Sequence, residues 1–136
     1  MNIRSRCHRI LRKLKAFDCD QGLVSSAHIA SDEGFLGSYV NIDKSIAFAL
    51  TEQALYVLEA DHKRYRRIPI AEISDAVRRE DVEKHLARQL TLVLQDLSDV
   101  ELRIDGRGDR FSDVFEVQRF FMRVQDDLDD VSDEAQ

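Results

Sequence analysis

Apolar residues at the start of the chain recur every three or four positions, which is the spacing of an amphipathic helix. Basic residues occupy the rest of the helical circumference. The apolar positions are Ile3, Cys7, Ile10, Leu14 and Phe17, with Leu11 at the edge of this stripe. The pattern predicts a helix over residues 2–17, then a polar linker over residues 18–32 that includes a strand at residues 23–29.

The middle of the chain alternates apolar and polar residues in short runs, which is typical of half-buried strands. Val100, Leu102 and Ile104 alternate with charged residues and form the clearest of these runs. Short polar stretches between the runs predict tight turns. The predicted strands cover residues 35–42, 46–50, 54–60, 65–70, 73–79, 86–95 and 100–104.

Helical spacing returns near the C-terminus. Asp113 and Glu116 have the spacing of a capping box and predict a helix that begins at Asp113. Its main apolar stripe consists of Val114, Val117, Phe121, Val124, Leu128 and Val131. Phe111, Phe115 and Met122 lie well round from this stripe, so the apolar arc is wider than one sheet needs. These three residues mark either an interface or a surface that the first helix or an early strand covers.

Length and composition indicate one globular domain without disulfides or bound metal. The chain has 136 residues, of which 43% are hydrophobic and 34% charged. We expect the domain at residues 21–131, preceded by the helix and linker of residues 1–20 and followed by an acidic tail at residues 132–136. Apolar runs are too short for a membrane span or a signal peptide. Cys7 and Cys19 are therefore expected to be free thiols in the cytoplasm.

Charge is distributed unevenly along the sequence. The net charge of −6 disfavours nucleic-acid binding by the whole surface. Before Asp18 the chain has no acidic residue and carries Arg4, Arg6, Arg9, Arg12, Lys13 and Lys15. After Arg123 it has no basic residue and carries Asp126, Asp127, Asp129, Asp130, Asp133 and Glu134. The acidic end either pairs with the basic start, within one chain or across a dimer, or stays solvated.

No catalytic or metal-binding motif is recognisable. His8, His28, His62 and His85 are scattered, and neither a phosphate-binding glycine loop nor a GxSxG motif occurs. Residues 105–116 place four acids at positions of a calcium loop, but Arg110 occupies the position that requires glycine. We therefore expect no enzyme, no cofactor and no small-molecule substrate. The alternative is a small hydrolase or transferase whose site combines residues distant in sequence.

Two runs resemble bacterial pleckstrin-homology-like and GRAM-like domains. Residues 46–58, IAFALTEQALYVL, are similar to the "apolar-LT-x-x-x-L-Y-V-L" hairpin of those domains, and residues 66–73, RRIPIAEI, resemble the "R-x-I-P-hydrophobic-x-x-I" segment that follows it. Residues 90–94, the strand to Ile104 and the helix with Phe120 and Phe121 match the later sheet and the C-terminal helix. The resemblance covers about residues 44–125.

The resemblance implies a mainly β, α+β fold with seven strands in a bent antiparallel sheet or partly open β-barrel. A C-terminal helix caps this sheet, and the N-terminal helix is additional. It also implies a non-enzymatic binding or adaptor module. Members that bind phosphoinositides use Lys and Arg in the loop after the first strand, whereas residues 29–39 hold two acids and no base. Inositol phosphate binding at that loop is therefore not expected.

Two candidate surfaces follow from these patterns. The first is a partner-binding surface for another protein or a second copy of the chain, and it combines Arg4, Arg9, Arg12 and Lys13 with Phe111, Phe115 and Met122. The second is an anion-binding cluster at a predicted hairpin tip, Lys63, Arg64, Arg66 and Arg67. For the basic helix, the alternative partner is an anionic membrane surface, which would make the protein membrane-peripheral. In either cluster the charges can also be merely solvated.

Overall fold

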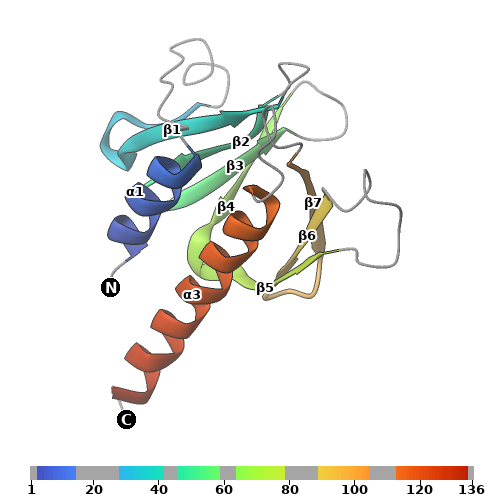
Figure 1. The fold of residues 1–136 in the computed structure, drawn as a ribbon. Helices are drawn as coiled ribbons and strands as arrows, with labels where there is room; N and C mark the ends of the chain where they lie inside the picture. The colour runs from blue at the N-terminus through green and yellow to red at the C-terminus, as the bar shows by residue number, and fades with distance from the viewer. Residues whose placement is uncertain are drawn as a thin grey trace.

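The computed structural model describes residues 3–14, 28–41, 46–58, 64–78, 89–104 and 113–134, with side chains as far as residue 128 except that of Ser31. These residues form an α+β fold with two antiparallel sheets and two α-helices (Figure 1). The helices are α1 (Ile3–Leu14) and α3 (Asp113–Glu134). The first sheet contains, in order, β1 (Phe35–Val40), β2 (Ile46–Thr51), β3 (Ala54–Leu58) and β4 (Tyr65–Pro69). The second contains β5 (Ile73–Arg78), β6 (Gln89–Leu94) and β7 (Asp99–Arg103).

Each strand within a sheet pairs with the next one along the chain. Two of the connecting turns, β2–β3 and β6–β7, are described in full. At the β2–β3 turn, the Thr51 hydroxyl accepts hydrogen bonds from the backbone N–H groups of Gln53 and Ala54, at 3.1 and 2.9 Å. At the β6–β7 turn, Leu97 has a φ of 70° and its N–H donates to the carbonyl of Leu94. All seven strands predicted from residue 35 onward are confirmed, with ends that differ by a few residues.

The predicted arrangement of these strands needs a correction. They form two separate sheets of four and three strands, not one continuous sheet, and they do not close into a barrel. The break follows from Pro69, which ends β4 and lacks an N–H group to donate. The chain then passes through the short 3₁₀-helix η2 (Ile70–Glu72) before β5 begins. The strand predicted at residues 23–29 lies largely outside the described residues, and His28 and Ile29 are not in a strand.

One hydrophobic core joins both sheets and both helices. Its largest fully buried side chains come from β1, β2, β3, β4, η2, β6, β7 and the two helices, and include Tyr39, Leu50, Leu55, Leu90, Leu92, Leu102 and Val117. The Tyr39 hydroxyl donates a 2.7 Å hydrogen bond to the buried carboxylate of Asp113. This contact ties the start of α3, at the residue predicted to begin that helix, to β1.

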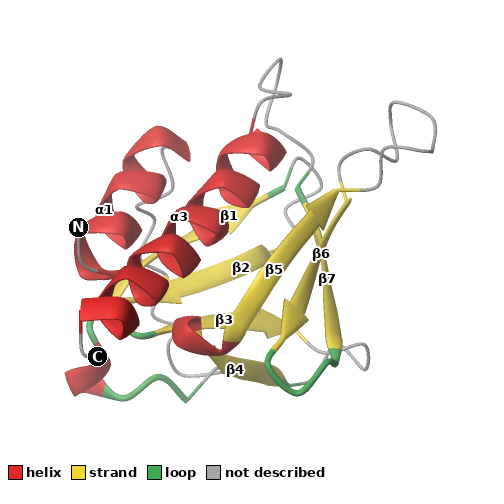
Figure 2. Ribbon diagram, turned by 90° about the horizontal axis from the view of Figure 1, so that it is seen from below, coloured by secondary structure: helices red, strands yellow, loops and turns green. Residues whose placement is uncertain are grey.

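Helix α1 packs against this core and is not a free appendage. Its predicted apolar face is confirmed where the structure describes it, since Cys7, Ile10, Leu11 and Leu14 are buried in the common core. Figure 2 shows α1 and α3 side by side on the same side of the sheets. Burial raises the pKa of the Cys7 thiol to about 12, with a further contribution from the charge of Glu52. Cys7 is a free thiol, as predicted, whereas Cys19 lies outside the described residues.

Candidate functional site

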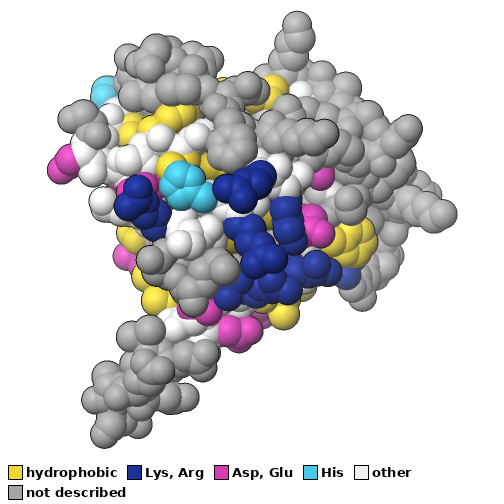
Figure 3. Space-filling view, turned by 60° about the vertical axis from the view of Figure 1, so that its left-hand side comes forward, with side chains coloured by type: hydrophobic (Ala, Val, Ile, Leu, Met, Phe, Trp, Pro, Cys, Tyr) yellow, Lys and Arg dark blue, Asp and Glu magenta, His cyan; other side chains and the backbone are white. Residues whose placement is uncertain are grey.

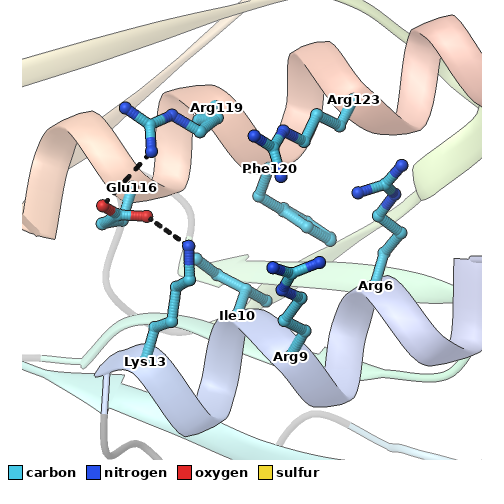
Figure 4. A pocket seen from close by; sticks show the side chains of 8 residues that line it. All are labelled: Arg6, Arg9, Ile10, Lys13, Glu116, Arg119, Phe120 and Arg123. Carbon is cyan, nitrogen blue, oxygen red and sulfur yellow. Dashed lines mark hydrogen bonds and ion pairs between the residues drawn. The ribbon is translucent and has the colours of Figure 1, made fainter.

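A shallow groove runs between α1 and α3, and we call it the interhelical groove. It has an open volume of about 280 Å³ and is lined by Arg6, Arg9, Ile10, Lys13, Glu116, Arg119, Phe120 and Arg123 (Figure 4). The lining positions on each helix recur at three- and four-residue spacing, so they lie on one side of that helix. Ion pairs from Arg6 to Asp127 and from Lys13 to Glu116 show that the two helices run antiparallel.

Basic side chains dominate the interhelical groove. Five of its eight lining residues are Arg or Lys, and only Glu116 is acidic. Lys and Arg side chains gather in one patch on the face of the molecule drawn in Figure 3. In a chain with a net charge of −6, this concentration of positive charge is a local feature of the fold. It arises because basic residues from the two ends of the sequence meet.

The best-shielded ion pair of the groove joins Arg6 to Asp127. The Arg6 Nε donates to the Asp127 Oδ2 at 2.7 Å and the Nη2 donates to the Oδ1 at 3.1 Å, which is a bidentate pair. Only 15% and 19% of the two side chains are exposed. The hydrogen bond to Asp127 raises the pKa of Arg6, and the hydrogen bond from Arg6 lowers the pKa of Asp127. The basic start and the acidic end of the chain therefore pair here within one chain.

The remaining positive charge of the groove is only partly compensated. Glu116 lies 3.2 Å from the Lys13 Nζ and 3.7 Å from an Arg119 guanidinium nitrogen, so one carboxylate serves two bases. Within the described part of the chain, Arg9 and Arg123 have no carboxylate partner. Guanidinium groups bind carboxylate or phosphate oxygens in a planar, two-point geometry. The groove can therefore bind an anionic group without breaking the Arg6–Asp127 pair.

Replacing Asp127 with asparagine tests the contribution of that pair to stability. At neutral pH we expect Asp127→Asn to lower the free energy of unfolding by about 1 kcal/mol, the upper range for a pair that keeps some solvent contact. Because the folded-state pKa of Asp127 is lowered, the stabilisation is present above its unfolded pKa of about 4. It is lost as the pH falls through the folded pKa, so the difference between variant and wild type should vanish in acid.

Urea denaturation at neutral and acidic pH measures both effects. Asp126→Asn is the matched control, because Asp126 is the exposed neighbouring acid. The control should change the free energy of unfolding by less than about 0.5 kcal/mol. Equal effects of the two substitutions at neutral pH would contradict a specific Arg6–Asp127 contribution.

The four basic residues predicted for a partner surface are divided by the structure. Arg9 and Lys13 line the interhelical groove. Arg4 instead pairs with Glu52 at 2.7 Å, beside the β2–β3 turn on another side of α1. Arg12 is exposed and lies outside the groove.

The aromatic and apolar residues predicted for the same surface lie on the outer side of α3. Phe115 and Met122 remain 44% and 52% exposed, so neither α1 nor an early strand covers them. The Arg78 guanidinium lies 4.0 Å from the centre of the Phe115 ring, a cation–π contact. Phe111 lies outside the described residues. Phe115 and Met122 therefore form a surface next to the groove and not part of it.

The cluster predicted to bind anions at a hairpin tip is not assembled by the described residues. Lys63 lies outside them, and Arg64 precedes β4. Arg66 and Arg67 are consecutive in β4, so their side chains point to opposite faces of the sheet. Arg67 donates a 2.8 Å hydrogen bond to the buried carboxylate of Glu33. Arg67 is therefore part of an ion pair with Glu33 inside the fold.

Sequence patterns missed three groove residues on α3: Glu116, Arg119 and Arg123. Their spacing of three and four residues places them along one edge of the apolar stripe, and this signal is visible in the sequence. It becomes informative only once α1 is known to lie antiparallel beside that edge. Arg6 belongs to the basic start of the chain, but its pairing with Asp127 depends on the same packing of the two helices.

The chain offers no other site with recognisable chemistry in its described part. There, no group of three or more His, Cys, Asp or Glu side chains is arranged to hold a metal ion. The described helices are all too short or too polar to cross a membrane. No protein-family model matches the sequence, and no curated protein matches it either. The interhelical groove and the outer side of α3 therefore carry the functional inference.

Proposed function

We propose that the chain is a non-enzymatic binding module of pleckstrin-homology-like architecture, and that its interhelical groove binds an acidic segment of a partner protein. Four meandering strands, then three, then a closing helix support the architectural part of this proposal. The concentration of five basic side chains around one groove carries the functional part. Fold alone would not suffice, because one fold serves many functions.

Arginine chemistry favours a carboxylate-rich ligand. Four of the five basic side chains are guanidinium groups, and Arg9 and Arg123 have no acidic partner among the residues described. A ligand with alternating or adjacent carboxylates would satisfy both and relieve the repulsion between them. The net charge of −6 works against a long polyanion such as nucleic acid, because charges outside the groove repel it. A short acidic protein segment meets both conditions.

The shape of the groove favours an extended segment over an enclosed small molecule. The groove is shallow and open to solvent, and it lacks the enclosing walls that bury most of a small ligand in a typical pocket. Its described lining contains no histidine, cysteine or serine, and the two lining residues that can carry a proton, Lys13 and Glu116, form an ion pair with each other. Both features support binding over catalysis.

An anionic membrane is the second candidate partner, and the packing of α1 disfavours it. A membrane-seeking helix inserts its apolar face among the lipids. In this fold that face, with Ile10, Leu11 and Leu14, is buried in the core. Insertion would require α1 to detach from the domain, whereas a protein segment can bind to the groove as it stands.

The test is a titration of the full chain, isotopically labelled, with an oligoglutamate peptide while amide NMR shifts are followed. We expect shift changes concentrated on α1 and α3 and weakened by added salt. The double variant Arg9→Glu/Arg123→Glu should weaken peptide binding at least about tenfold. Arg12→Glu is the matched control, because it reverses a charge on α1 outside the groove, and it should change binding by less than about twofold.

Vesicles that contain phosphatidylserine form the second arm of the titration. Vesicle binding that survives Arg9→Glu/Arg123→Glu, together with no response to the peptide, would replace this proposal with the membrane alternative. Equal weakening by Arg12→Glu and by the double variant would mean that general charge attracts the peptide, and it would contradict a role for the groove.

A further inference from the structure

The outer side of α3 carries a stripe of exposed residues, which we call the α3 outer stripe. Phe115, Arg119, Met122 and Asp126 follow one another at intervals of four, three and four residues, so they lie on one face of the helix. All four are exposed in the described structure, and the two apolar ones are among its four exposed large hydrophobic side chains. The stripe thus alternates apolar and charged residues of both signs.

We propose that the α3 outer stripe pairs with the same stripe of a second copy of the chain, in a two-fold symmetric dimer with antiparallel α3 helices. In a two-fold interface each contact occurs twice, so the surface must be complementary to itself. The stripe meets this condition. Antiparallel pairing centred beside Met122 brings Arg119 opposite Asp126 of the partner subunit, and Asp126 opposite Arg119 of the partner subunit. Met122 then packs against Met122 of the partner subunit.

Charges just beyond the two ends of the stripe also favour antiparallel pairing. The last turns of α3 extend past the start of α1 (Figure 1), and their sequence is strongly acidic. Antiparallel pairing directs these turns of the partner's helix toward Phe115. There the Arg78 guanidinium lies 4.0 Å from the ring centre and supplies a positive charge. Parallel pairing would instead bring the two acidic ends together, and like charges would repel.

The size of the stripe predicts a weak dimer. Stable interfaces bury about 800 Å² on each partner, which is more than the face of a single helix offers. The association should therefore be reversible and sensitive to salt, because Arg119 and Asp126 pair at the surface. Antiparallel pairing leaves the two interhelical grooves on the same face of the dimer. If the groove binds acidic segments as proposed, a partner with two such segments would bind more tightly than a partner with one.

A charge swap across α3 tests the dimer without any acidic ligand. Sedimentation of the full chain is measured in dilute salt at protein concentrations up to about 1 mM. The wild-type chain should associate with a dissociation constant that is typical of weak complexes. Arg119→Asp and Asp126→Arg alone each place like charges opposite one another and should weaken association at least about tenfold. The double variant Arg119→Asp/Asp126→Arg restores opposite charges and should recover association. Met122→Asp should abolish association, and no second substitution in the stripe is expected to restore it.

Circular dichroism and urea denaturation verify that each variant stays folded. A wild-type chain that remains monomeric throughout the concentration range would overturn the proposal, and so would a double variant no better than the single ones. These outcomes are separable from failure of the groove proposal. Arg119 belongs to both surfaces, so the dimer test measures self-association without peptide. The groove test uses Arg9 and Arg123, which lie off the stripe, and its readout is binding of a peptide.

Discussion

Leu11→Ala should lower the free energy of unfolding by about 2–5 kcal/mol, the range for truncating a fully buried leucine. Leu11 is 0% exposed and belongs to the core cluster that joins both helices to both sheets. Truncation removes apolar contacts and leaves a cavity that the surrounding strands cannot fill completely. Leu11→Asp should be more severe and should unfold most of the protein, because a buried unpaired carboxylate is added to the lost packing.

Urea denaturation of Leu11→Ala measures this loss directly, and Arg12→Ala is the matched control. Arg12 is the next residue on the same helix and is exposed, so its truncation should change the free energy of unfolding by less than about 0.5 kcal/mol. The comparison also bears on function. If α1 were a detached, membrane-seeking helix, Leu11→Ala would be as harmless to stability as Arg12→Ala, and the groove between α1 and α3 would not persist in solution.

Local patterns predicted the elements of this fold well. The alternation of Val100, Leu102 and Ile104 with charged residues marks β7, and the three-four spacing from Val114 onward marks α3. These signals are local, because a strand or a helix needs its own residues to fit one buried face. The separation into two sheets was not predicted. It depends on where the chain turns at η2 and on which strands find partners, and neither is determined by alternation within one run.

The interhelical groove shows a second limit of sequence patterns. Arg6 and Asp127 are 121 residues apart, and nothing in the sequence specifies that they meet. The uneven charge of the two chain ends suggested pairing but left open whether it occurs within one chain or between two. The packing of α1 on α3 shows that Arg6 pairs within its own chain. It also brings Arg119 and Arg123 to the same groove as Arg9.

Arg67 is a second case in which a long-range partner could not be predicted from the sequence. Its place in a basic run suggested an exposed hairpin tip, yet it pairs with Glu33 at 2.8 Å. Glu33 itself directly follows residues 18–32, where the sequence pattern predicts a polar linker that includes a strand. Glu33 is only 6% exposed, and its carboxylate accepts hydrogen bonds from Tyr56, Arg67 and Thr51 at 2.6, 2.8 and 3.3 Å. A buried carboxylate with three donors joins η1 (Ser31–Glu33) to the first sheet.

Glu33→Ala should therefore lower the free energy of unfolding by about 3 kcal/mol, the lower end of the range for breaking a buried charge pair. The lower end applies because the Arg67 side chain is 44% exposed and regains water when its partner is removed. Most of the loss comes from the Tyr56 hydroxyl, which is left without its acceptor in a buried position. Glu33→Gln keeps one oxygen that can accept from Tyr56, but it loses the charge and replaces the oxygen that accepts from Arg67 and Thr51 with an NH2 donor, so it should be less destabilising than Glu33→Ala but not neutral.

Alkaline pH provides an independent measurement of the same cluster. Burial, followed by the hydrogen bond to Glu33, raises the pKa of Tyr56 from 10.0 to about 12 in the folded protein. Since the folded-state pKa is raised, its stabilising contribution is complete below pH 10 and is lost as the pH rises toward 12. Urea denaturation across this range should show a loss of stability that is smaller in Tyr56→Phe, which has no group to ionise there. Parallel losses of stability in Tyr56→Phe and wild type would contradict a raised pKa of Tyr56 in the folded protein.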